Sequence, residues 1–89
     1  MPRYIQLVKF RKKPTKEMIK QNLELLEREK KMGVQFKEIY WTLGRYDVVV
    51  ILDAPNEKVV MQGALARAEN MSAETMVAVP AEEARKLVE

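Results

Sequence analysis

The residues best suited to chemistry gather in one short segment, Gly44-Arg45-Tyr46-Asp47, which lies between two apolar runs. A tyrosine hydroxyl can donate or accept a hydrogen bond, and a desolvated carboxylate can serve as a general base. Side chains alternate along a strand, so we expect Tyr46 and Asp47 to point to opposite sides of a sheet rather than to act as one pair. Asp47 is equally suited to accept backbone N–H groups or to pair with Arg45. The segment is therefore either part of a site or a structural turn.

Gly44 has a structural explanation, because a tight β-turn often requires a positive φ that glycine adopts without steric cost. A small-ligand site needs a few polar groups among apolar ones. The candidate ligand-binding residues are Gln6, Tyr40, Thr42, Arg45, Tyr46 and Asp47, with Trp41 and Glu74 as further lining residues. Alternation prevents all of them from facing one cavity. Gln6 stands out because it interrupts an apolar series, and a buried amide needs hydrogen-bond partners.

The chain has no cysteine and no histidine. Disulfides, thiolate catalysis and zinc-thiolate sites are therefore excluded, and the usual general base and metal ligand are missing. Carboxylates such as Glu38 and Asp53 are scattered without the spacing of metal ligands, and the three glycines are too far apart for a phosphate-binding loop. We expect neither a metal nor a cofactor.

The net charge of +3 comes from one segment. Lys9, Arg11, Lys12, Lys13 and Lys16 lie within eight residues that contain no acid, whereas the other 11 basic residues are outnumbered by 13 acidic ones. The longest purely apolar run, Val48 to Leu52, is too short to cross a membrane, so we expect a cytoplasmic protein without a membrane segment. The high content of lysine and glutamate is typical of thermophile proteins.

Local patterns predict four strands and three helices. We place the strands at 3–10, 34–43, 46–52 and 74–79, a first helix between Thr15 and Gly33, a second between Pro55 and Asn70, and a short one after Pro80. Thr15 suits a helix N-cap, Pro55 a first helical position, and Asn70 a left-handed helix end. The Gly44-Arg45 link predicts a tight hairpin.

This β-α-β-β-α-β order, with a short C-terminal helix, is that of a ferredoxin-like α+β domain, and we expect residues 1–89 to form one such domain. The four strands should make one antiparallel sheet with both crossover helices on one face. RNA-binding domains of the RRM type share this order, but their aromatic signature is absent. We therefore expect the basic segment to be a solvated turn and not a nucleic-acid site.

Both faces of the predicted sheet are apolar. The third strand offers Val48, Val50 and Leu52 on one face and Val49 and Ile51 on the other, and in the second strand Val34, Phe36 and Tyr40 oppose Ile39, Trp41 and Leu43. A face that met water would alternate with polar residues. We infer a homodimer or higher oligomer, packed sheet to sheet or edge to edge. The alternative cover is the C-terminal helix, which offers only Leu87 and Val88.

The hairpin sequence Tyr40-Trp41-Thr42-Leu43-Gly44-Arg45-Tyr46-Asp47 resembles the Gly-x-Tyr-Asp signature of the GYD-domain family. The similarity extends from Pro2-Arg3-Tyr4 through the Ala54-Pro55 helix start to Glu82-Glu83. This resemblance implies a small ferredoxin-like protein of the dimeric α+β barrel type. The hairpin is also similar to that of the effector-binding domain of Lrp/AsnC-type regulators, which binds small molecules at subunit interfaces.

Two functions remain open from the sequence. The first is a homo-oligomer that binds a small molecule in a pocket between sheets, or at a subunit interface, near the Gly44–Asp47 hairpin. The second is a small cofactor-independent enzyme, oxygenase-like or isomerase-like, of the same barrel type. The residues do not decide between them, because no second catalytic group stands at a defined spacing from Asp47.

Overall fold

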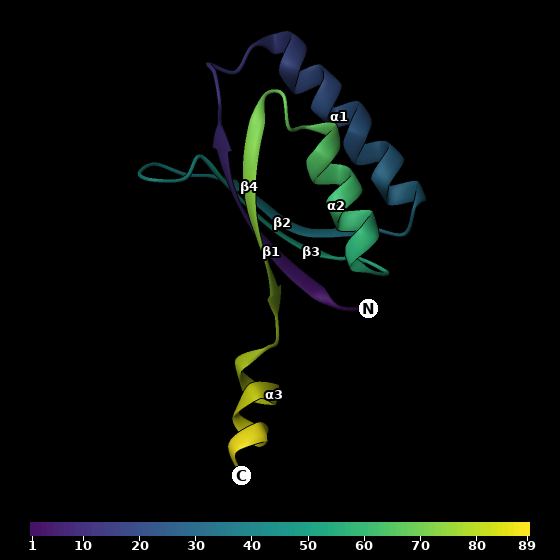
Figure 1. Ribbon diagram of the computed structural model, residues 1–89, viewed down its shortest axis with the longest axis vertical. Helices are drawn as coiled ribbons and strands as arrows, with labels where there is room; N and C mark the ends of the chain where they lie inside the picture. The colour runs from purple at the N-terminus through teal and green to yellow at the C-terminus, as the bar shows by residue number, and fades with distance from the viewer.

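The computed structural model describes residues 1–89 and contains one four-stranded antiparallel sheet in the order β2-β3-β1-β4 (Figure 1). The elements are β1 (Arg3–Phe10), α1 (Lys16–Lys31), β2 (Gln35–Trp41), β3 (Val48–Asp53), α2 (Glu57–Ala66), β4 (Met71–Ala78), α3 (Ala81–Arg85) and a 3₁₀ turn, η1 (Lys86–Val88). The predicted ferredoxin-like α+β order is confirmed. None of the helices combines the length and the apolar character that crossing a membrane requires.

The limits of α1 agree with the sequence signals. The Thr15 side chain accepts a hydrogen bond from the Met18 backbone N–H at 3.1 Å, which satisfies one of the free donors of the first turn. At the other end Gly33 has φ 98°, a left-handed conformation that glycine adopts without cost. The first helix is therefore fixed by local chemistry at both ends.

The limits of α2 differ from the prediction. Asn56 is the N-cap, and its side chain accepts a hydrogen bond from the Val59 N–H at 3.1 Å, so Pro55 precedes the helix instead of occupying its first position. An asparagine oxygen satisfies a free donor at the helix start, which proline does not. The prediction for Asn70 is also wrong: no residue other than glycine has a positive φ, and α2 ends earlier, at Ala66.

The connection between β2 and β3 is longer than the tight turn predicted at Gly44-Arg45. It runs from Thr42 to Asp47. The backbone N–H of Thr42 donates to the Asp47 carbonyl at 2.8 Å, and this hydrogen bond closes the base of the loop. The fourth strand starts at Met71, before the predicted 74, since β4 pairs with the whole of β1, from Phe10 opposite Met71 to Arg3 opposite Ala78.

A β-bulge changes the faces of β2. The register with β3 shifts between Phe36 and Glu38, so two neighbouring residues oppose one position of the partner strand. Phe36, Ile39 and Trp41 consequently line the same cavity. The expectation that Phe36 opposes Ile39 and Trp41 was therefore wrong, because it assumed an unbroken period of two.

The core lies on the sheet face that α1 and α2 cover (Figure 1). Buried and half-buried residues alternate along β3, so this chain fully covers only one of the two apolar faces of the strand. The buried core residues are Tyr4, Val8, Val34, Val48, Val50, Leu52, Ala54 and Val60. Only one residue of α1, Met18, is buried. The first helix therefore closes over the sheet incompletely.

The opposite face of the sheet is open. By alternation with the core residues it carries Ile5, Leu7, Tyr40, Val49, Ile51 and Met76. The C-terminal helix does not cover this face, because α3 extends away from the end of β4 (Figure 1), leaving Leu87 80% and Val88 87% exposed. At one rim, the Arg3 guanidinium donates to Asp53 at 2.8 Å.

Candidate functional site

Asp47 attaches the hairpin to the central strand β1. Its backbone N–H donates to the Val8 carbonyl, and its carboxylate accepts a hydrogen bond from the Phe10 N–H, both at 2.8 Å. The bond from Phe10 uses the carboxylate to accept a backbone N–H, which is one of the roles expected from the sequence. Gly44 lies at the tip of the loop with φ 104°, a conformation that would be strained for a residue with a side chain. The strain would come from the backbone alone, because no atom lies within 4 Å of the position that a Cβ would take.

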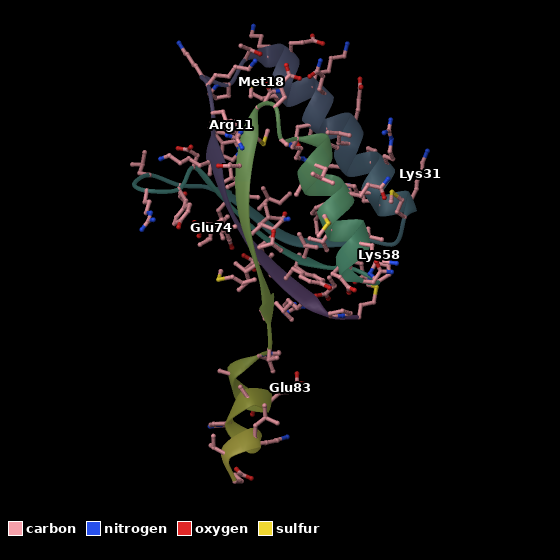
Figure 2. The ribbon with its side chains drawn as sticks, viewed as in Figure 1. Arg11, Met18, Lys31, Lys58, Glu74 and Glu83 are labelled. Carbon is pink, nitrogen blue, oxygen red and sulfur yellow. The ribbon has the colours of Figure 1, made fainter.

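Tyr46 forms a side-chain pair with Glu74 of β4. Its hydroxyl donates to Glu74 Oε2 at 2.8 Å, and the Arg45 guanidinium lies 5.5 Å from the centre of its ring. The pKa of Tyr46 is raised above its ordinary value of 10.0, mainly because its hydroxyl donates this hydrogen bond to Glu74. Glu74 lies on the side of the sheet away from α1 and α2 (Figure 2). The pair can donate and accept hydrogen bonds at the edge of the open face.

The structure does not bring the six candidate residues together. Tyr40 is exposed on the open face, and Thr42 is used locally, its hydroxyl donating to the Tyr46 carbonyl at 2.8 Å. Gln6 lies on the helix-covered face and donates to the Thr75 hydroxyl at 3.2 Å. Of the six, Gln6 alone lines an apolar cavity that 24 residues surround.

That cavity lies between the sheet and helices α1 and α2. It has a volume of about 270 Å³, and 18 of its 24 lining residues are hydrophobic. Four large apolar side chains that line it are also exposed, namely Ile19, Leu23, Ile39 and Trp41. Because two belong to α1 and two to β2, they mark an opening between these elements. The Phe10 and Trp41 rings, 5.3 Å apart and tilted by 60°, form part of the wall.

A cluster of polar side chains forms one wall of this cavity. Arg67, which follows α2, donates to Glu29 through Nη2 at 2.6 Å and through Nη1 at 2.9 Å. Its Nε donates to Asn22 Oδ1 at 2.7 Å, and Nη1 also reaches the Gly63 carbonyl at 3.0 Å. The Arg67 and Glu29 side chains are only 17% and 12% exposed, so this is a largely desolvated, two-pronged ion pair. We call Asn22, Glu29 and Arg67 the polar cluster.

Gly63 makes room for the polar cluster. A Cβ at this position would clash with Glu29 Oε2 and lie 3.3 Å from Arg67 Nη1. The absence of a side chain at Gly63 therefore allows a close approach between the two helices. The close approach observed here is that of a carboxylate from the other helix.

The polar cluster was not predicted from the sequence. Asn22 lies four residues after Met18 and Glu29 three after Leu26, so both interrupt the apolar stripe of the first helix. These two polar residues within an apolar stripe could have been recognised in the sequence, as Gln6 was recognised within an apolar strand. The spacing of Glu24 with Arg28 and of Glu27 with Lys31 would allow ion pairs along this helix, but neither pair forms. Glu27 pairs with Lys30 at 3.0 Å instead.

The chemistry available in the cavity is that of binding. Its apolar walls can hold the body of a small molecule, while the polar cluster on its lining offers hydrogen bonds. No group of three or more acidic side chains comes together in a way that could hold a metal ion.

Comparison with known proteins places the whole chain in one family. No curated protein and no solved structure is similar enough to give a significant match. The family model described as GYD domain matches residues 4–88. This match covers the three helices, the four strands except for Arg3 at the start of β1, and the hairpin whose sequence carries the Gly-x-Tyr-Asp residues. The chain belongs to the GYD domain family.

Proposed function

We propose that this protein binds a small, mostly apolar molecule in the cavity between its sheet and helices α1 and α2. The proposal rests on the cavity itself, whose lining is predominantly apolar and whose polar side chains are the polar cluster and Gln6. Ligand pockets in proteins combine apolar walls with a few fixed polar groups in this way. The hairpin, where the sequence suggested a pocket, then has a supporting role through the bonds of Asp47 to β1.

The cavity volume limits the size of the ligand. An engineered apolar cavity of about 150 Å³ holds one benzene molecule. The volume of about 270 Å³ is nearly twice as large, and so suits a molecule of about ten non-hydrogen atoms. The exposed apolar side chains between α1 and β2 provide its route of entry.

We also propose that the protein is a homo-oligomer formed through the open sheet face. Ile5, Leu7, Val49 and Ile51 lie together on the two central strands, and no element of the same chain covers them. An apolar sheet face of this kind is stabilised when a second copy buries it. Tyr40, Arg45 and Tyr46 would then lie at or near the interface, where a ligand contact with them is a further proposal.

Binding in the cavity can be tested with n-octanol, which has an apolar body, one hydroxyl and about ten non-hydrogen atoms. Trp41 is the single tryptophan and lines the cavity, so its fluorescence reports binding directly. We expect a saturable change in the wild type. Ala64→Leu, which fills the cavity, should abolish that change.

The matched control is Ala66→Leu, because Ala66 lies on the same helix but is exposed and does not line the cavity. It should bind octanol like the wild type. The proposal is wrong if octanol gives no saturable change, or if the two leucine variants, both folded by circular dichroism, bind equally well.

A further inference from the structure

We propose that the ligand is an uncharged molecule whose single polar group is a hydroxyl or carbonyl oxygen, and that Glu29 excludes carboxylates from the cavity. This inference rests on the proposed function, because it specifies the ligand of the same cavity. It makes Glu29 a specificity-determining residue and Arg67 and Asn22 the groups that hold the ligand oxygen.

The charge of the polar cluster is already balanced. Both Glu29 oxygens accept from Arg67, so the positive charge of the guanidinium has its counter-ion within the protein. Both side chains are less than a fifth exposed, where water screens charge poorly. The cluster therefore offers a ligand hydrogen bonds but no net charge.

The cluster keeps donors that no protein group uses. Arg67 has five N–H groups, of which one goes to Asn22, one to Gly63 and two to Glu29, leaving one on Nη2. The amide nitrogen of Asn22 donates to no protein group either. Unused donors on residues that line an apolar cavity match a ligand oxygen, which accepts hydrogen bonds.

A carboxylate would meet Glu29 at the same place. If it approached Arg67 with Glu29 still in position, two negative charges would share one guanidinium away from water. If it displaced Glu29, that carboxylate would lose its partner in a largely buried position, which is costly. Gly63 allows Glu29 to take this position, because Glu29 Oε2 occupies the space that a Cβ at residue 63 would fill.

The experiment compares n-octanol with octanoate, which share one chain length and differ in charge at pH 7. Dissociation constants come from Trp41 fluorescence for the wild type, Glu29→Gln and Glu27→Gln. Glu27 is the matched control because it lies on the same helix, is exposed, and does not line the cavity. Glutamine preserves the shape of Glu29 and removes its charge.

We expect the wild type and Glu27→Gln to bind octanol at least about tenfold more tightly than octanoate. Glu29→Gln should lose this preference or reverse it, because Arg67 is then free to pair with octanoate. Two results would overturn the inference while leaving cavity binding intact: octanoate binding the wild type as tightly as octanol does, or Glu29→Gln keeping the wild-type preference. Failure of both probes to bind the wild type would remove the proposed function and this inference together.

Discussion

Arg67 and Glu29 join the two helices through a two-pronged ion pair, with N–O distances of 2.6 and 2.9 Å between residues 38 positions apart. The pair lies on the wall of the cavity, so it both connects α1 to α2 and sets the polarity of the space beneath them. One contact thus links the stability of the helical layer to the chemistry of the candidate site.

Arg67→Ala should destabilise the protein by about 2 to 4 kcal/mol, because it leaves the Glu29 carboxylate without its partner in a largely desolvated position. Urea unfolding at pH 7 measures this difference. Arg85→Ala serves as the comparison, since Arg85 pairs with Glu82 at 3.7 Å on the surface and should change stability little. Equal effects of the two substitutions would show that the pair between the helices has no special role.

Gly63→Ala should lower stability, because its new methyl group occupies the place of Glu29 Oε2. In a Glu29→Ala background the same substitution should become stabilising by up to about 1 kcal/mol, since alanine favours a helix, the clash with Glu29 is gone, and Arg67 is no longer held by that carboxylate. A double-mutant cycle measured by thermal unfolding tests this reversal of sign. A cost of Gly63→Ala that persists without Glu29 would contradict the account.

Stability at acid pH should depend on Asp53. The pKa of Asp53 is lowered below its ordinary value of 3.8, mainly because its carboxylate accepts a hydrogen bond from Arg3. A carboxylate with a lowered folded-state pKa contributes stability above the unfolded-state pKa and loses it as the pH falls through the folded-state value. The free energy of unfolding, measured with urea, should therefore decrease less between pH 5 and pH 2 in Asp53→Asn than in the wild type. An unchanged acid profile would contradict this role of the pair.

Leu7→Lys should dissociate the proposed oligomer. Leu7 lies at the centre of the open sheet face, opposite Val49 of β3, and a charge there opposes burial against a second copy. Light scattering should show an oligomer for the wild type and a monomer for the variant. Met61→Lys, on the exposed side of α2, is the control and should keep the wild-type mass. A monomeric wild type at micromolar concentration would remove the proposed assembly.

The elements that the sequence predicted well are those with local signals. The bounds of β1 were correct because a β-branched and aromatic run ends at Arg11, and both ends of α1 follow from Thr15 and Gly33. The start of α2 was misplaced because two local signals competed, and the cap at Asn56 took precedence over Pro55.

The candidate site could be predicted only in part. Gln6 was found because one amide interrupts an apolar strand, and it does line the cavity. The polar cluster joins Asn22 and Glu29 to Arg67 across two helices, and no local spacing fixes how one helix turns toward another. The bulge at Phe36 likewise depends on pairing with β3, so the composition of the cavity wall could not be derived from alternation alone.

The most direct test of cavity binding is nuclear magnetic resonance of the methionine methyl groups during titration with n-octanol. Met18 and Met71 line the cavity, whereas Met61 lies on the outside of α2 and Met76 on the open sheet face. Binding in the cavity should produce saturable shifts of the Met18 and Met71 signals, with the Met61 and Met76 signals unchanged. Unchanged Met18 and Met71 signals, or shifts confined to Met76, would contradict it.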